Sequence, residues 1–237
     1  TTKINNEHFE IVFSQKEEVT KAVLYPKVEI TELKAEFDTV HLCTPQAKVF
    51  VNGYQSWTDS REFSVNEKLP KSSFPGVVLP LLKVYGDEKF VKYPSTKGVF
   101  HGFTYAYIRE LNKVCLYGSM SEAFGFTIIR INTKTNSVSI YKDLEGVTFK
   151  TPYEILNIGY FVGEYDEVFD RYFTLQNLPA LRMKNATGYT SWYNYYTKVT
   201  RKDIERDLQS FKDAGITPDF FQVDDGYQTN VGDWLSV

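Results

Sequence analysis

The sequence contains few of the residues that build metal sites, disulfide frameworks or membrane spans. Its 237 residues include two cysteines, Cys43 and Cys115, and three scattered histidines, none at the spacing of a disulfide framework, metal site or catalytic triad. No apolar run reaches the roughly 18 residues of a transmembrane helix, and no glycine loop for phosphate or dinucleotide binding is present. The formal net charge of -3 provides no strong field for nucleic acid or acidic lipid. We therefore expect no metal, no cofactor, and neither nucleic acid nor membrane as a partner.

The N-terminal residues also lack the pattern of a secretory signal. Residues 1–6 have no charged segment that is followed by an apolar one, which predicts a cytoplasmic protein. Position 1 is not methionine, which is typical of a processed or trimmed chain.

Aromatic residues, in contrast, are abundant, with 17 Tyr, 18 Phe and 3 Trp. Flat amphipathic rings stack on the apolar faces of sugars while their polar groups bond to hydroxyls. An aromatic-rich β core is the simpler cause, because aromatic side chains are enriched in strands. The composition therefore favours a β-rich core and is compatible with sugar binding.

The first 160 residues have the pattern of a β protein. Short β-branched and aromatic runs are separated by Gly, Asn, Ser or Pro, and 133–136 is a plausible hairpin turn. Many short strands without helical spacing between them predict a β-sandwich over residues 1–160. The stretch 69–94, rich in Pro, Gly and Lys, predicts a long irregular excursion. The predicted strands are 8–13, 48–53, 105–108, 113–117, 126–131 and 137–141.

The hydrophobic spacing becomes helical near Glu164. Apolar residues recur at helical intervals from Val168 to Phe173, and acidic residues precede them, which favours a helix because of its dipole. Pro179 then ends the pattern. We expect this helix to connect two domains, with residues 161–182 as the linker.

One β-α-β unit follows. Residues 188–192 have the composition of a strand, and 193–199 that of a loop. Thr200 and Asp203 predict a variant of the capping box, and Gly215 is placed to end the helix. Residues 220–223 form the second predicted strand. Short parallel strands with a crossover helix build doubly wound sheets or β/α barrels.

Two adjacent carboxylates, Asp224 and Asp225, follow this second strand and precede a glycine. A barrel strand delivers catalytic and binding groups to its carboxyl end in this way. Adjacent side chains of an extended chain point to opposite faces, so the pair is poorly suited to act as an acid and nucleophile. Carboxylates accept hydrogen bonds from several hydroxyls, which favours sugar binding. The alternative is ordinary Asp-Gly turn chemistry.

Aromatic residues mark two further candidate sites. Trp192 and Tyr193 end the preceding strand, where they either flank the same edge as Asp224 or pack in the core. The segment Asn-Gly-Tyr-Gln-Ser-Trp, residues 52–57, follows a predicted strand. It provides either an aromatic platform for a ligand or a contact between domains.

Four segments together resemble the α-galactosidases of glycoside hydrolase family 36, the melibiase type. They are Asn-Gly-Tyr-Gln-Ser-Trp at 52–57, Gly-Tyr-Thr-Ser-Trp-Tyr at 188–193, Phe-Gln-Val-Asp-Asp-Gly-Tyr-Gln at 221–228 and Gly-Asp-Trp at 232–234. The resemblance implies a β-sandwich at 1–160, a linker helix at 161–182 and the start of a catalytic (β/α)8 barrel at 183–237. It also implies release of terminal α-linked galactose from oligosaccharides, with retention.

The same resemblance assigns roles to particular residues. It implies that Asp224 and Asp225 bond hydroxyls 4 and 6 of galactose, that Trp192 and Tyr193 lie in the sugar pocket, and that Trp57 reaches it from the sandwich. Tyr189 stands where many relatives have Trp, so the resemblance implies aromatic packing at this position but does not carry over the detailed shape of the subsite.

The family carries its nucleophile on a later barrel strand, in a Lys-x-Asp setting, and its acid/base further on. Neither position exists in this sequence, so we expect no catalytic residue in the chain and no activity from it alone. It would then be the N-terminal portion of an enzyme acting on α-galactoside oligosaccharides, with homo-oligomerisation left open. Two alternatives remain: a carbohydrate-binding β-sandwich module without catalysis, and a transglycosylase of the raffinose- or stachyose-synthase kind.

Overall fold

The computed structural model describes residues 1–55, 58–70, 87, 91–94, 96–180, 182, 185–230 and 232–235. The chain divides into two compact units, Thr1–Leu178 and Pro179–Val237, and each is described by itself. The predicted division into a β-sandwich at 1–160, a linker helix at 161–182 and a barrel start at 183–237 stays a prediction.

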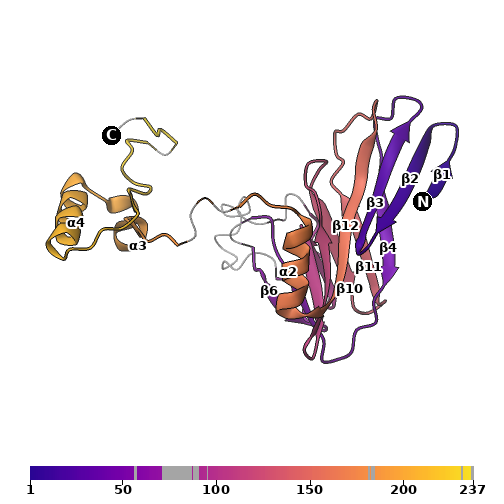
Figure 1. The fold of residues 1–237 in the computed structure, drawn as a ribbon, viewed down its shortest axis with the longest axis horizontal. Helices are drawn as coiled ribbons and strands as arrows, with labels where there is room; N and C mark the ends of the chain where they lie inside the picture. Colours follow the sequence, from indigo (N-terminus) through magenta and orange to yellow (C-terminus); the bar gives the residue numbers. More distant parts are fainter. Residues whose placement is uncertain are drawn as a thin grey trace. The chain divides into compact units, whose positions relative to one another are not determined.

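Two antiparallel sheets form the first unit (Figure 1). Apolar side chains from both sheets, such as Val49 and Phe63 from one and Ile129 and Val138 from the other, share one buried core. This arrangement is consistent with the expected β-sandwich. The large sheet has the order β1 (Thr2–Asn5), β2 (Phe9–Lys16), β3 (Val19–Pro26), β12 (Tyr153–Glu164), β9 (Lys113–Ser119), β8 (Tyr105–Glu110), β5 (Lys48–Val51) and β6 (Arg61–Ser64). The small sheet has the order β4 (Glu36–Val40), β11 (Ser137–Lys142), β10 (Thr127–Asn132) and β7 (Val99–Phe103).

The six strands expected from the sequence correspond to β2, β5, β8, β9, β10 and β11. The predicted turn 133–136 is confirmed, because it joins β10 to β11 and Asn132 pairs with Ser137. The longest strand, β12, was not predicted. It contains a register shift between Glu154 and Leu156, and residues 155–159 are buried on both faces, so its sequence lacks a period of two. The predicted excursion 69–94 lies mostly outside the described residues.

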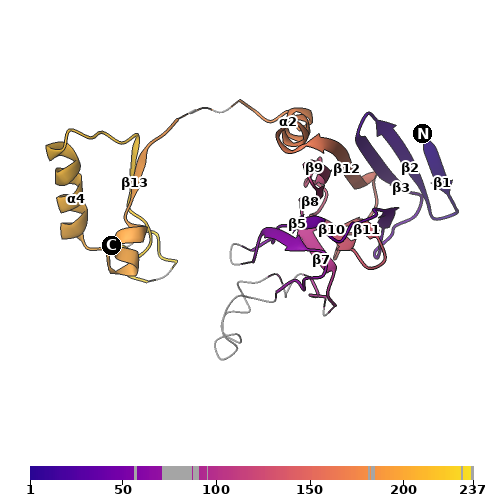
Figure 2. The ribbon, with the colours of Figure 1, turned by 90° about the horizontal axis from the view of Figure 1, so that it is seen from below.

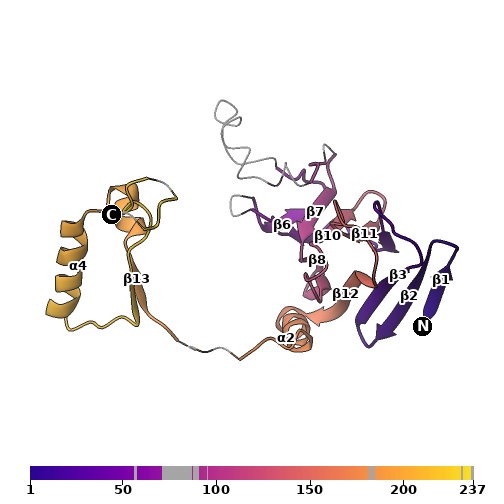
Figure 3. The same ribbon diagram turned by 90° about the horizontal axis from the view of Figure 1, so that it is seen from above.

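The predicted helical spacing near Glu164 corresponds to α2 (Tyr165–Leu175). The helix packs against β9 and β12, on the side of the large sheet away from β10 and β11 (Figures 2 and 3). Tyr172 is buried, and its hydroxyl donates to the carbonyl of Ser119 at 2.8 Å. A Cβ at Gly118 would lie 2.5 Å from the Tyr172 ring, so the glycine makes room for it.

The second unit contains the expected β-α-β arrangement. Strand β13 (Gly188–Thr190) pairs in parallel with β14 (Phe220–Gln222), and α4 (Arg201–Asp213) connects them. The Thr200–Asp203 capping box is confirmed. Gly215, at φ +68°, follows the C-cap, and the amide of Ile216 bonds to the carbonyl of Phe211, which completes a Schellman motif.

The predicted strand 188–192 and loop 193–199 need correction. The strand ends at Thr190, and Trp192 begins a short helix, α3 (Trp192–Tyr195), which is followed by the 3-10 turn η3 (Tyr196–Lys198). The amides of Asn194 and Tyr195 bond to the carbonyl of Ser191, so the backbone bonds of this segment are local rather than part of the sheet. No helix in the described ranges is long and apolar enough to span a bilayer.

Candidate functional site

Hydrogen bonds tie together the carboxyl ends of β13 and β14. The Ser191 amide donates to the carbonyl of Gln222 at 3.2 Å, and the Asp224 amide donates to the Ser191 hydroxyl at 2.9 Å. Ser191 is fully buried. Because the strands are parallel, Trp192 and Asp224 follow them at the same edge, as expected from the sequence.

The Asp224 carboxylate is held by residues of both strands. Its Oδ2 accepts hydrogen bonds from the Thr190 hydroxyl at 3.1 Å and from the side-chain Nε2 of Gln222 at 3.4 Å. Its Oδ1 accepts a bond from the Asp225 amide at 2.7 Å. A carboxylate oxygen can accept two bonds, so, among the residues that the structure describes, Oδ1 keeps one acceptor position for another donor.

The Asp225 carboxylate closes the turn that follows. Its Oδ1 accepts bonds from the Gly226 amide at 2.9 Å and from the Gln228 side chain. Within the described part of the chain, no donor bonds to its Oδ2, although the residue is partly buried. The turn chemistry considered as an alternative is therefore present, and it leaves acceptor positions open on both carboxylates.

Gly226 seats this turn against another loop. Its φ of +103° favours glycine. A Cβ at this position would lie 2.5 Å from Cα and 2.7 Å from the carbonyl carbon of Thr197, in η3. The turn that carries Asp224 and Asp225 thus rests directly on the backbone of the loop after β13.

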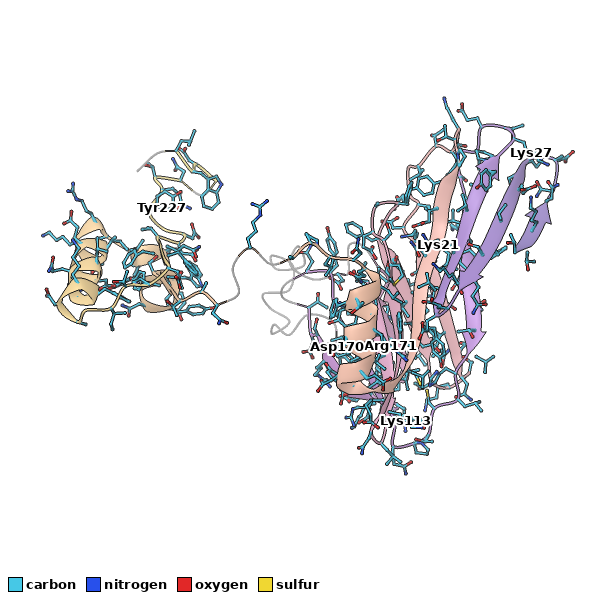
Figure 4. All side chains as sticks on the ribbon, viewed as in Figure 1. Lys21, Lys27, Lys113, Asp170, Arg171 and Tyr227 are labelled. Atoms are coloured by element: carbon cyan, nitrogen blue, oxygen red, sulfur yellow. The ribbon has the colours of Figure 1, made fainter. Side chains whose placement is uncertain are left out.

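The aromatic candidates are close to this edge in sequence but make no described contact with the carboxylates. Trp192 is half-buried and packs edge-to-face on Tyr196, with ring centroids 5.4 Å apart. Tyr193 is 81% exposed. Tyr227, labelled in Figure 4, lies in the loop after β14, and its hydroxyl donates to the carbonyl of Trp234 at 3.3 Å. The pocket roles of Trp192 and Tyr193 remain predictions.

An acidic residue of α4, Asp207, was not identified from the sequence. Its Oδ2 accepts bonds from the hydroxyls of Tyr189 at 2.6 Å and Tyr195 at 2.7 Å, and Arg206 bonds to its Oδ1 at 3.3 Å. Burial disfavours the charged form of Asp207, but these hydrogen bonds hold its pKa below the usual range. We call these four residues the Asp207 cluster. No motif marks it, because its members meet only in the folded unit.

In the first unit, buried Asp87 organises the loop after β5. Its carboxylate accepts bonds from the amides of Tyr54 and Gln55, at 3.0 Å and 2.8 Å, and from the Thr58 hydroxyl at 3.0 Å. The predicted site residue Trp57 lies outside the described residues. The choice between a ligand platform and a domain contact for this loop therefore remains open.

The buried His101 and the carboxylates and thiols of the described residues were candidates for a catalytic or metal site. His101 on β7 is buried, neither of its ring nitrogens has a hydrogen-bond partner in the described structure, and burial lowers its pKa to about 4. The described residues contain no group of three or more His, Cys, Asp or Glu arranged to hold a metal ion.

Comparison with known proteins relates the second unit to galactoside-processing enzymes. Residues 169–233 match the family model of raffinose synthase or seed imbibition protein Sip1. A 55-residue segment is 44% identical to the probable galactinol–sucrose galactosyltransferase 1 of Arabidopsis thaliana. The match covers 23% of this chain and 7% of that protein. These findings support a relation to the glycoside hydrolase 36 group but not specifically to its α-galactosidases.

Proposed function

We propose that this chain belongs to an enzyme that processes terminal α-galactosides and that its Asp224–Asp225 turn binds the galactosyl group. The observation that carries the proposal is the pair of carboxylates with open acceptor positions at the carboxyl edge of two parallel strands. This edge lies in the segment that matches the raffinose synthase model. Neutral hydroxyls are the donors that such acceptors suit.

The two carboxylates have different parts in this proposal. Asp224 is fixed by Thr190 and Gln222, so its free acceptor position has a defined direction. Asp225 offers Oδ2, while its Oδ1 holds the turn. Hydroxyls 4 and 6 of galactose would donate to these oxygens. Binding and orientation of the sugar, rather than bond cleavage, are the work assigned to this chain.

In the complete reaction, a nucleophile of the enzyme would displace the alcohol of the donor sugar, which takes up a proton from a general acid, and form a covalent galactosyl-enzyme. The hydroxyl of an acceptor would then lose its proton to the same acid/base group and displace the nucleophile, with overall retention. Retaining enzymes place their two catalytic carboxylates about 5–5.5 Å apart on either side of the scissile bond. A turn that uses part of both carboxylates for its own hydrogen bonds is better suited to recognition. In this proposal β13, α4 and β14 are the first unit of a β/α barrel.

We favour transfer of the galactosyl group to a sugar hydroxyl over its transfer to water. The matched family model and the Arabidopsis relative are both named for the synthesis or transfer of galactosides. Hydrolysis is the second candidate, because the motifs resemble α-galactosidases. A binding module without catalysis is less well supported, since the match lies mainly in the second unit rather than in the sandwich.

Product analysis tests this proposal. The protein purified from its natural source is incubated with galactinol and sucrose, and separately with melibiose and raffinose. We expect a galactosylated sucrose as the main product of the first mixture. Free galactose as the main product would assign hydrolysis, and no conversion of any of the four sugars would contradict the proposal.

The variant Asp225→Asn of the complete enzyme, produced recombinantly beside the unsubstituted enzyme, tests the binding turn with the same sugars. Asparagine keeps the oxygen that closes the turn and replaces the open acceptor with a donor. We expect at least a roughly tenfold loss of turnover at low substrate concentration, because one charge-assisted hydrogen bond is lost. Asp213→Asn, in the last turn of α4, is the matched control and is expected to leave turnover unchanged.

A further inference from the structure

The Asp207 cluster joins three parts of the second unit at one carboxylate oxygen. Tyr189 comes from β13, Tyr195 from the end of α3, and Asp207 from the middle of α4. Both tyrosine hydroxyls donate to the same Oδ2, at 2.6 Å and 2.7 Å. An ionised carboxylate accepts such bonds more strongly than a neutral group, so the cluster restrains all three elements.

The two tyrosines restrain different elements: Tyr189 holds β13, and Tyr195 holds the end of α3, against α4. The Tyr189 ring stacks on Phe221 of β14 with centroids 4.1 Å apart and packs edge-to-face on Phe211 of α4. The strand would therefore keep contact with the helix without the Tyr189 hydroxyl. In the described structure, the Tyr195 ring has no aromatic partner on β13 or β14, and the guanidinium carbon of Arg206 on α4 lies 5.7 Å from the centroid of the Tyr195 ring. Its hydroxyl bonds to Asp207 and Arg206 hold the end of α3 on the helix.

The loop that Tyr195 holds is the one on which the carboxylate turn rests. Residue 196 has a φ of +52°, and Thr197 follows it directly. The backbone of Thr197 contacts Gly226 so closely that no Cβ fits between them. A displacement of the end of α3 would therefore move Thr197 and, with it, the turn that contains Asp225.

We propose that Asp207 is a positioning residue for the galactose-binding turn, acting through Tyr195 and the backbone of Thr197. The inference rests on the proposed function of Asp224 and Asp225. Asp207 itself does not touch the sugar: its oxygens bond to tyrosine hydroxyls and to Arg206. The position of the Asp224 and Asp225 carboxylates at the carboxyl edge of β13 and β14 would depend on the Asp207 carboxylate.

Two single-hydroxyl deletions separate positioning from general stability. Tyr195→Phe and Tyr189→Phe each remove one donor to the same oxygen. We expect Tyr195→Phe to weaken galactose binding by roughly three- to tenfold. Tyr189→Phe should change it by less than about twofold, because ring packing retains its strand. Asp207→Asn should match Tyr195→Phe, and Asp213→Asn is the control.

A second measurement needs no sugar. The amide resonances of Asp225 and Gly226 in the 237-residue chain should shift in Tyr195→Phe and Asp207→Asn but not in Tyr189→Phe. Galactose affinities and amide shifts that are equal in the two tyrosine variants would overturn the positioning role. If the unsubstituted chain does not bind galactose, the binding role of the turn fails, while the amide shifts still decide whether Asp207 positions the turn.

Discussion

Replacement of Gly226 with alanine is expected to disrupt the carboxylate turn more than the same change at another positive-φ glycine. Two costs add at this position. A backbone held at φ +103° strains a non-glycine residue by about 1–3 kcal/mol. The new Cβ would also lie 2.5 Å from the Cα of Thr197, and overpacking of this kind costs about 1–3 kcal/mol more.

Gly232→Ala provides the matched control. Gly232 has a φ of +88°, but its added Cβ would meet no atom of the described residues within 4 Å. The loss in free energy of unfolding of Gly232→Ala therefore comes from backbone strain alone. The difference between the two variants in free energy of unfolding, about 1–3 kcal/mol, isolates the contact with Thr197.

Denaturant unfolding followed by tryptophan fluorescence measures this difference, since Trp192 and Trp234 both belong to the second unit. Galactose titration of the same samples should show weaker binding for Gly226→Ala and unchanged binding for Gly232→Ala. Equal losses of stability and equal affinities in the two variants would refute the claim that the turn rests on Thr197.

Two predictions concern the first unit. Since the folded pKa of His101, about 4, lies below its ordinary value of 6.5, the unfolded chain binds the proton first as the pH falls. Stability should therefore decrease by roughly 3 kcal/mol between about pH 6.5 and 4, and His101→Leu should remove this part of the pH dependence in urea unfolding. Asp87→Ala should cost at least about 2 kcal/mol, because three donors lose their acceptor. Faster amide exchange at Tyr54 and Gln55 would accompany it, and an unchanged melting temperature would argue against this role of Asp87.

Regular local patterns made part of the fold predictable. The strands that bury one face, such as β11 with its alternating burial, follow from a period of two. The ends of α4 follow from Thr200, Asp203 and Gly215, because capping depends on neighbours in sequence. Strand β12 escaped prediction because α2 covers one of its faces and the core the other, which removes the alternation.

The candidate site was predictable where its residues adjoin strand ends and not elsewhere. Asp224 and Asp225 come one residue after β14 ends at Gln222, so the parallel topology alone places them at the carboxyl edge. Asp207 stands beside Glu205 and Arg206 on α4, and a run of charged residues on a helix predicts solvent exposure rather than a hydrogen-bonded cluster. Its bonds to two tyrosines depend on how α4 packs on β13, which no local pattern encodes. Asp87 likewise lies far in sequence from the loop it organises.

Discrimination between galactose and glucose tests the central claim most directly. The two sugars differ only in the orientation of hydroxyl 4, one of the groups assigned to the Asp224–Asp225 turn. In a titration followed by the amide resonances of the chain, galactose should shift Asp225 and Gly226 saturably, while glucose should shift them far less. Equal shifts with both sugars, or saturable galactose binding that leaves these two amides unmoved, would contradict the account.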